Sequence, residues 1–163
     1  MEKTSAVIAR WVAEYLDATA TLDAAPVHRS ALVVLPPERV WARLTDAQAL
    51  VNGGLGVLRL EGTIAAGERL KVWSEASPDR AFALTVTEFT PHRRMVWTGG
   101  MPLGLFTGVR QFTLTPGSRG TEFHMHEAFT GLMAPLISRS IPDLNPSFQK
   151  FARGLQALAE EKA

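Results

Sequence analysis

The stretch from Gly108 to Phe129 constrains the fold most, because it predicts a β-hairpin whose register can be argued from its side chains. Two runs of alternating apolar and polar residues, GVRQFTLTP and TEFHMHEAF, flank the turn sequence GSRG. A shift of one residue would scatter the apolar side chains over both faces of the sheet. With residues 117–120 as the loop, the opposed pairs, which share a face, are Leu114 with Phe123, Phe112 with Met125 and Arg110 with Glu127 on one side, and Gln111 with His126, Thr113 with His124 and Thr115 with Glu122 on the other. The hairpin therefore presents an apolar inner face that ends in an Arg–Glu pair, and a polar outer face.

Length, charge and cysteine content narrow the class of protein. A chain of 163 residues with 46% apolar and 20% charged residues fits a single globular domain with a substantial core. The formal net charge of +1 gives no reason to expect nucleic acid or an anionic membrane surface as a partner. Because cysteine is absent, disulfides, thiolate metal sites and cysteine nucleophiles are excluded. The first twenty residues include five charged ones, and no apolar run is long enough to span a bilayer, so we expect a cytoplasmic protein without membrane insertion.

The segment between residues 28 and 98 predicts one strand, two short helices and then a run of strands separated by turns. Pro37 and Glu38 suit the first turn of the first helix, where a missing N–H costs little and a negative charge meets the helix dipole. The expected strands are residues 28–35, 57–61, 68–75, 81–89 and 93–98, and the expected helices are residues 37–44 and 46–51. The expected cross-strand pairs are Leu70 with Val86, Val72 with Leu84, Ser74 with Phe82, Val86 with Trp97 and Glu88 with Met95.

Residues 4–18 predict an amphipathic helix outside the main domain, followed by a linker at residues 19–27. The apolar positions of this helix recur at helical spacing and include two large aromatics, Trp11 and Tyr15. One interpretation is a helix packed on its own domain, and the other is a contact in a homodimer or a lid. We therefore divide the chain into an N-terminal helical extension, residues 1–27, and a main domain, residues 28–163.

The C-terminal part changes from strand to helix periodicity. Residues 133–141 predict a short helical segment, and Asn145 followed by Pro146 suits the cap and first turn of a long final helix. Apolar residues at steps of three and four form one stripe along that helix, namely Phe148, Phe151, Ala152, Leu155, Leu158 and Ala159. Only the inner face of the sheet is large enough to bury this stripe. A strongly twisted sheet curls around such a helix, and the space between sheet and helix either remains as a cavity or is closed by side chains into a filled core. The residues expected to form the wall of this space are Met95, Trp97, Phe112, Met125, Phe148 and Phe151.

The succession VVLPPERVWARLTD, VTEFTPHRRMVWTGG, GLFTGVRQFTLTP and GTEFHMHEAFTGLMAPL before a long C-terminal helix resembles the START-like, or SRPBCC, superfamily. Within it the chain is similar to the bacterial polyketide cyclase/dehydrase-like proteins, over roughly residues 28–160. The resemblance implies an α+β helix-grip fold, in which a curved antiparallel sheet of about seven strands surrounds the long helix and holds a hydrophobic ligand. Such proteins bind lipids, sterols, polyketides or plant hormones, and some catalyse cyclisation or dehydration. The residues expected to contact a small hydrophobic ligand are Leu84, Val86, Met95, Trp97, Arg110, Phe112, Met125, Glu127, Phe148, Phe151 and Leu155.

Arg110 and Glu127 are the polar pair of this otherwise apolar wall, and they admit two interpretations. As functional groups they anchor a ligand carboxylate or hydroxyl, or Glu127 acts as a general acid or base. As structural groups they form a cross-strand bridge at the rim. Three functions follow as alternatives. The leading one is a non-catalytic carrier of a small hydrophobic molecule; the others are a cyclase or dehydratase with Glu127 as its catalytic candidate, and an interaction module that uses the N-terminal helix.

His124 and His126 form an H-x-H pair on one face of a predicted strand, a spacing that suits two metal ligands. A metal site needs a third ligand, and from the sequence neither His28 nor His92 is clearly placed to supply it. A phosphate-binding glycine loop and a nucleophile elbow are both missing from the sequence. We therefore expect no metal and no cofactor.

Overall fold

The computed structural model describes residues 27–161 and, within them, the side chains of residue 31 and of residues 33–161. The helix expected at residues 4–18 and most of its linker lie outside the described residues. The described chain runs through β1 (Val27–Val33), α2 (Pro37–Leu44), α3 (Ala47–Asn52), β2 (Val57–Glu61), β3 (Arg69–Ser74), β4 (Ser77–Thr90), β5 (Arg94–Gly100), the 3-10 turn η1 (Pro102–Gly104), β6 (Thr107–Gly117), β7 (Gly120–Thr130), α4 (Ala134–Ser138) and α5 (Asn145–Glu160).

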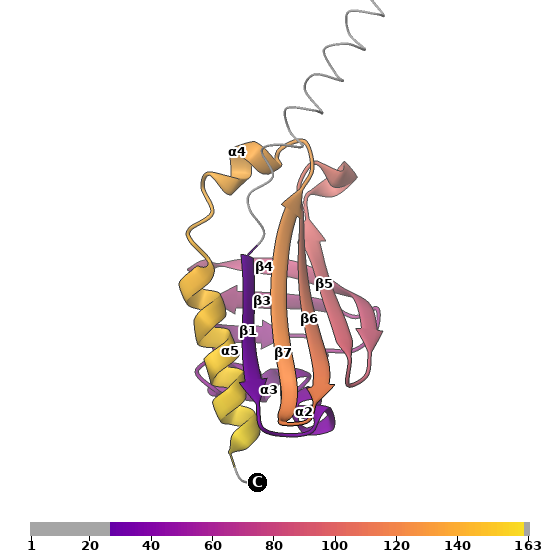
Figure 1. The fold of residues 1–163 in the computed structure, drawn as a ribbon. Coiled ribbons are helices and arrows are strands. Elements are labelled where there is room, and N and C mark those ends of the chain that lie inside the picture. The colour runs from indigo at the N-terminus through magenta and orange to yellow at the C-terminus, as the bar shows by residue number, and fades with distance from the viewer. Residues whose placement is uncertain (1–26, 162–163) are drawn as a thin grey trace, which may run out of the picture.

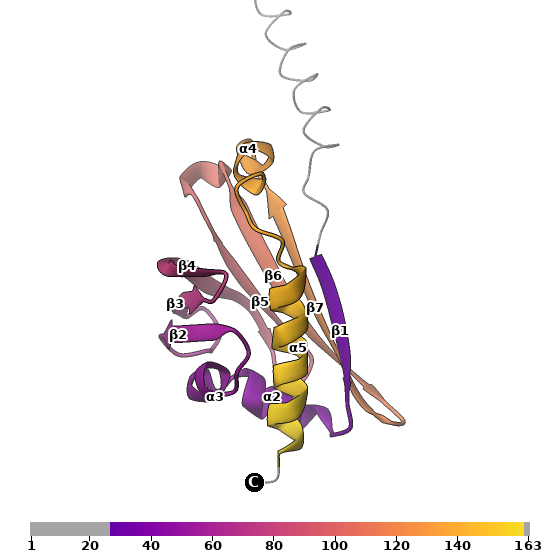
Figure 2. The same ribbon diagram turned by 90° about the vertical axis from the view of Figure 1, so that its left-hand side faces the viewer.

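The seven strands form one antiparallel sheet in the order β1-β7-β6-β5-β4-β3-β2. In Figure 1, β2, β3 and β4 run across the direction of β1, β5, β6 and β7, which shows how strongly the sheet twists. Figure 2 shows the result, a sheet that curls around α5 with α2 and α3 near its lower end. This is the α+β helix-grip fold that the resemblance implied, with the expected seven strands. Among the described residues, no helix is both long and apolar enough to cross a bilayer.

The apolar stripe of α5 packs into the core, as its spacing predicts. Five of its residues are buried and Leu158 is half-buried. The expected N-cap is wrong by one residue, because α5 already begins at Asn145 and Leu144 takes the cap position without a side-chain hydrogen bond. Asp143 satisfies the first turn instead: its Oδ1 accepts from the backbone N–H of Asn145 at 3.0 Å and from the side-chain amide of Asn145 at 2.6 Å.

The central hairpin has the predicted register. All six expected pairs between β6 and β7 are present, including Arg110 with Glu127. The loop is tighter than expected, because Gly117 and Gly120 pair and leave a two-residue turn. Gly120 has a φ of +135°, and a Cβ at this position would lie 2.2 Å from the carbonyl oxygen of Val33. A glycine is therefore required where the end of β1 passes close to the hairpin.

The hairpin of β3 and β4 differs from its expected register by two residues. Leu70 pairs with Leu84, Val72 with Phe82 and Ser74 with Ser77, so the turn lies at residues 75–76 rather than 76–80. A register shift between Val72 and Ser74 accompanies this tighter turn. A shift of two residues leaves every side chain on its predicted face, because the side-chain period of a strand is two.

A second bulge lies between β4 and β5. Val86 pairs with Trp97 as predicted, but the register then shifts and Glu88 lies opposite Val96 instead of Met95. Met95 pairs with Phe89. A bulge inserts a residue that alternation alone does not reveal, so the prediction holds on one side of it and fails on the other.

Asp46 caps α3, in the position predicted for the start of the second short helix. Its Oδ1 accepts hydrogen bonds from the backbone N–H groups of Gln48 and Ala49, both at 3.0 Å. We expect Asp46→Ala to lower the free energy of unfolding by about 1 kcal/mol, because it leaves these two donors without their cap. Urea denaturation followed by circular dichroism measures this, with Asp79→Ala at an exposed position of β4 as the control. Equal losses in the two variants would contradict the capping role.

Candidate ligand-binding site

A row of four cross-strand neighbours on the inner face combines polar and apolar groups. Glu127 of β7 pairs with Arg110 of β6, Arg110 with Trp97 of β5, and Trp97 with Val86 of β4. The Glu127–Arg110 and Trp97–Val86 pairs were each predicted within one hairpin, whereas the Arg110–Trp97 pair was not predicted. The sheet therefore brings four of the expected site residues together side by side.

The next row and the facing helix supply the apolar part of the site. Met95, Phe112 and Met125 are at most 2% exposed, and α5 places Phe148, Phe151 and Leu155 opposite the sheet with at most 4% exposure. The Phe112 ring lies 5.8 Å from that of Phe151 and 4.9 Å from that of Trp97, measured between centroids. These side chains pack against one another, and the described structure fills the space between sheet and helix with them.

Arg110 and Glu127 form the partly open end of this wall. The Nε and Nη2 atoms of Arg110 donate to the same carboxylate oxygen, Oε2 of Glu127, at 3.2 and 2.7 Å. The Arg110 side chain is 25% exposed and that of Glu127 11%. The guanidinium also lies 5.0 Å from the ring centroid of Phe148 on α5, a cation–π contact that joins helix and sheet. Both contacts with Glu127 end on Oε2, which leaves Oε1 available as an acceptor.

Trp97 contributes a polar atom that pattern analysis missed. The residue is 1% exposed, and its indole Nε1 is buried without a hydrogen-bond partner among the described residues. A buried donor without a partner costs about 1–3 kcal/mol. Trp97 lies next to Arg110 in the cross-strand row, so this donor belongs to the same site as the Arg–Glu pair. No sequence pattern reports whether an indole N–H finds an acceptor.

The row beside this one carries two glycines on the inner face. The neighbouring row reads Leu84, Gly99, Gly108 and Phe129 across β4, β5, β6 and β7. Its two central positions carry no side chain, and half-buried Leu84 and Phe129 lie beside them. A Cβ on Gly99 would meet the Leu84 side chain and the Ala83 carbonyl oxygen, each at 2.6 Å, and one on Gly108 would meet Phe129 at 3.3 Å. At Gly108 the nearest group is a side chain that can move, whereas at Gly99 the backbone of Ala83 is as close as the Leu84 side chain.

Exposed groups lie at the start of β4 and in the β3–β4 turn, which α5 contacts. Phe82, on the same face of β4 as Leu84, is 40% exposed, and the Arg80 guanidinium lies 5.7 Å from its ring centroid. Lys150 of α5 reaches Glu75 in the β3–β4 turn, with Nζ and Oε2 2.6 Å apart. A separate open hollow lies at the far edge of the sheet. Leu84 is the only expected site residue that lines it, and the other lining residues are Glu61, Gly62, Arg69, Leu70, Lys71, Ala83 and Thr85.

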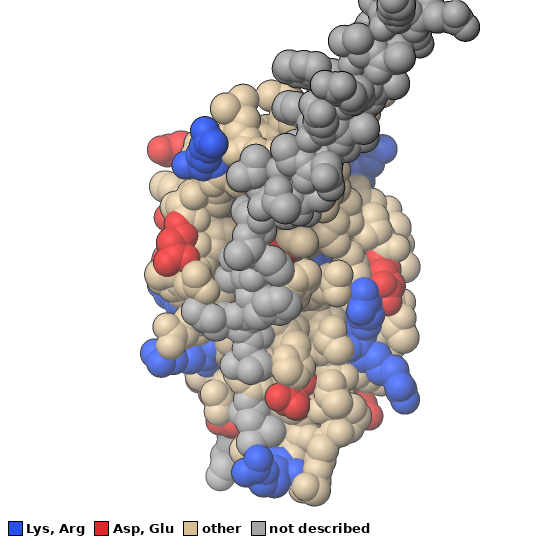
Figure 3. All heavy atoms as spheres, turned by 45° about the horizontal axis from the view of Figure 1, so that its top comes forward, with Lys and Arg blue, Asp and Glu red and all other residues tan. Residues whose placement is uncertain are grey.

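The surface of the described chain carries dispersed charge. Figure 3 shows basic and acidic side chains interspersed over one face, with wide uncharged stretches between them. Two of the ion pairs on the described chain, Arg94–Glu88 and Arg59–Glu61, involve side chains that are more than 40% exposed. On this face the described residues form no extended basic patch of the kind that attracts nucleic acid.

Several solved structures share the fold. A protein from Mesorhizobium loti is 20% identical, with a TM-score of 0.64 over 82% of this chain and 95% of that one. A hypothetical protein from Helicobacter pylori is 15% identical, with a TM-score of 0.68 over 83% and 88% of the two chains. The di-domain ARO/CYC StfQ of the steffimycin biosynthetic pathway is 14% identical, with a TM-score of 0.58 over 83% of this chain, which spans 49% of StfQ. No curated protein matches the sequence.

The family assignment rests on the sequence itself. The model of the family described as polyketide cyclase / dehydrase and lipid transport matches residues 24–161. That range includes all seven strands, α5 and every residue of the row from Glu127 to Val86. The chain therefore belongs to the polyketide cyclase/dehydrase and lipid transport family.

Proposed function

We propose that this protein binds a small hydrophobic molecule of lipid, polyketide or aromatic type between the inner face of the sheet and α5. The apolar part of the ligand lies against the wall of Met95, Phe112 and Met125, and its polar end meets Arg110 and Glu127. Burial of apolar ligand surface supplies the affinity, at about 25 cal/mol per Å² before the costs of association. The family description, which includes lipid transport, supports this class of ligand.

The observation that carries the proposal is the Arg110–Glu127 pair at the partly open end of an apolar wall. A charged pair placed this deep loses much of its hydration, and apolar residues of similar size often serve stability as well or better. In this pair, one carboxylate oxygen of Glu127 and part of the Arg110 guanidinium remain available for hydrogen bonds with another molecule. The pair is therefore suited to orient a ligand. The adjacent Trp97 Nε1 adds a donor that has no acceptor within the described residues.

Binding requires side chains to move, because the wall residues are packed in the described state. The row with Gly99 and Gly108 is where this is easiest, since its two central positions carry no side chain and its outer two, Leu84 and Phe129, are only half-buried. Arg110 is held to the helix by its contact with Phe148 and to the sheet by Glu127. A ligand that enters beside Leu84 displaces these contacts and selects a more open arrangement of the same residues.

Native mass spectrometry of the purified full chain is the first test, and we expect a co-purified apolar molecule. Titration with a fluorescent long-chain fatty acid follows, with saturation at one molecule per chain. Leu84→Trp fills the space over Gly99, so it should weaken binding by more than about tenfold, as expected when a binding pocket is blocked. Thr115→Trp, at an exposed position on the outer face, is the matched control. Absence of saturable binding, or equal effects of the two tryptophans, would refute the proposal.

Catalysis is the second candidate, favoured by the carboxylate of Glu127 beside the same apolar wall, whose Oε1 takes no part in the contacts with Arg110. A cyclase or dehydratase would use this carboxylate to move a proton on a bound polyketide. Glu127→Gln separates the two functions. A carrier should keep its fatty-acid affinity within about tenfold, whereas an enzyme should lose about 100-fold or more of its turnover while substrate binding is kept. Loss of water from a short poly-β-ketone thioester, followed by mass spectrometry, measures the turnover.

A further inference from the structure

Among the described residues, Trp97 is the only one with a buried side-chain nitrogen or oxygen that lacks a hydrogen-bond partner. The residue is 1% exposed, and the atom is its indole Nε1. An indole N–H donates and cannot accept, and buried polar groups in folded proteins are hydrogen-bonded with few exceptions. An unpaired donor at this depth points to an acceptor that another molecule supplies.

The neighbours of Trp97 across the sheet explain why the described chain offers it no acceptor. On the inner face the indole lies between Val86 of β4 and Arg110 of β6. A valine side chain has no polar atom, and a guanidinium only donates. The carboxylate of Glu127 lies one position further across the sheet, and Arg110 holds it. The side chains that α5 buries against the sheet are all apolar.

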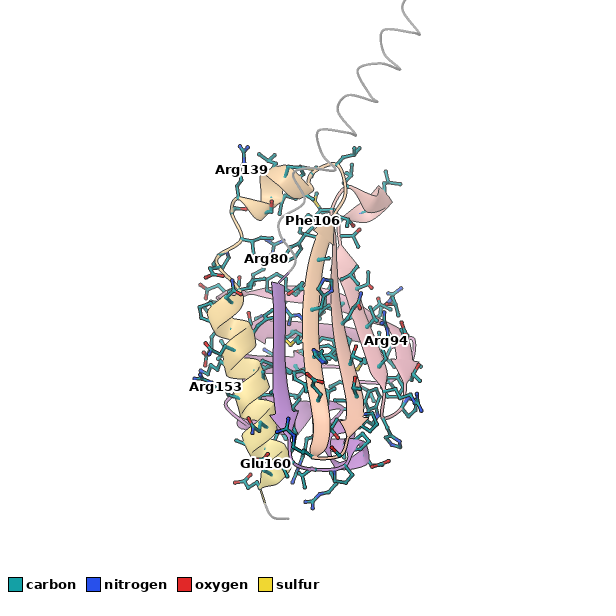
Figure 4. All side chains as sticks on the ribbon, in the orientation of Figure 1. Arg80, Arg94, Phe106, Arg139, Arg153 and Glu160 are labelled. Carbon is teal, nitrogen blue, oxygen red and sulfur yellow. The ribbon has the colours of Figure 1, made fainter. Side chains whose placement is uncertain are left out.

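Along β5 the inner face leaves the indole next to a position without a side chain. Gly99 follows Trp97 by two residues and therefore shares its face. At the far end of the glycine row, the ring of Phe129 stacks on that of Phe106, which Figure 4 shows near the upper end of β6. Leu84, at the near end, is half-buried. A ligand that enters beside Leu84 therefore reaches the row of Trp97 next.

Arg110 adds a second donor beside the indole. Its contacts with Glu127 use Nε and Nη2, so Nη1 remains for another partner. Side chains directly opposed across two strands have Cβ atoms about 4.5–5.5 Å apart, so one atom of a ligand can approach both donors. A carbonyl oxygen suits this position, because it has two lone pairs and no hydrogen that would need an acceptor of its own.

We propose that the site binds molecules with a carbonyl group on an apolar body, and that Nε1 of Trp97 and Nη1 of Arg110 donate to the carbonyl oxygen. This inference rests on the proposed ligand-binding function and narrows it to one chemical class, ketones and related carbonyl compounds. A hydrocarbon of the same shape leaves the indole N–H buried and unpaired, which costs binding free energy. Trp97 is thus the residue that determines specificity.

The test compares fluorenone with fluorene, flat molecules of nearly the same shape that differ by one carbonyl oxygen. Each displaces the fluorescent fatty acid from the full-length chain. We expect fluorenone to bind about tenfold more tightly, the ratio that one hydrogen bond in a buried site supplies. In Trp97→Phe, which keeps an aromatic ring and removes the donor, the two ligands should bind with similar affinity. Trp41→Phe, which removes a buried indole of α2 outside the site, is the matched control and should keep the ratio.

Nuclear magnetic resonance of the indole N–H groups gives a readout on the unaltered site. The chain has four tryptophans, and the signal that Trp11→Phe, Trp41→Phe and Trp73→Phe all retain belongs to Trp97. Fluorenone should shift the proton of this signal downfield, as a new hydrogen bond does. Fluorene, which has similar rings, controls for ring currents and should not produce this shift.

Three results would each overturn the inference: equal affinities of the unaltered chain for fluorenone and fluorene, a preference for fluorenone that survives Trp97→Phe, or an indole signal that responds alike to both. Fatty-acid binding that neither molecule displaces would also overturn it. In all of these cases saturable binding of the fatty acid leaves the proposed ligand-binding function standing. Loss of the function itself would show as no saturable binding of any of the three molecules.

Discussion

Phe112→Ala is expected to lower the free energy of unfolding by about 3–5 kcal/mol, the range for loss of a buried phenylalanine from a core. Phe112 is fully buried, and its ring lies 4.9 Å from Trp97, 6.4 Å from Phe123 and 5.8 Å from Phe151. It thus joins the sheet to α5 at the centre of the wall. Urea denaturation followed by circular dichroism measures the change, and the chevron of folding and unfolding rates shows whether the contact forms early.

Phe106→Ala is the matched control for this variant. Phe106 also stacks on another phenylalanine, with its centroid 5.6 Å from that of Phe129, but it is only half-buried in the connection before β6. Its removal exposes less apolar surface and should lower stability by about half as much or less. Equal losses in the two variants would mean that the centre of the wall is no better packed than its margin. That result would favour a loosely filled cavity over a packed core in the ligand-free protein.

The register of a hairpin could be predicted where both strands carry distinctive apolar and charged residues and where no bulge inserts an extra residue. In the β6–β7 hairpin, Leu114 faces Phe123 at one end and Arg110 faces Glu127 at the other, so this alignment gathers the apolar side chains on one face and pairs the two charges. In the β3–β4 hairpin, a register shift after Val72 and a turn at residues 75–76 moved the pairing by two residues. Bulges of this kind arise from local twist, and alternation of side chains leaves them undetected.

The site divides in the same way between local and distant pairing. Arg110 and Glu127 lie on one hairpin, so their contact followed from the sequence. The position of Trp97 next to Arg110 depends on the pairing of β5 with β6, which the connecting loop does not determine. Sequence spacing therefore predicted the charged pair and did not place the indole beside it.

Arg110→Met is expected to lower the free energy of unfolding by about 2–3 kcal/mol, because it leaves the carboxylate of Glu127 largely buried without its partner. The side chains of this pair are 25% and 11% exposed, so the loss should fall below that of a fully buried ion pair. The same substitution at Arg94 is the control, since the Arg94–Glu88 pair is more than 40% exposed on both sides. An exposed pair of this kind contributes about 0–1 kcal/mol.

The double variant Arg110→Met with Glu127→Leu decides what the pair is for. If the pair is only a structural bridge, two apolar residues of similar size should restore stability and leave the affinity for the fluorescent fatty acid unchanged. If it orients a ligand, as we propose, stability should return while affinity falls by about tenfold or more, the usual effect of losing a charge-assisted hydrogen bond. Stability and affinity then change in opposite directions. A double variant that regains stability and binds the fatty acid as well as the original chain would remove Arg110 and Glu127 from the ligand site.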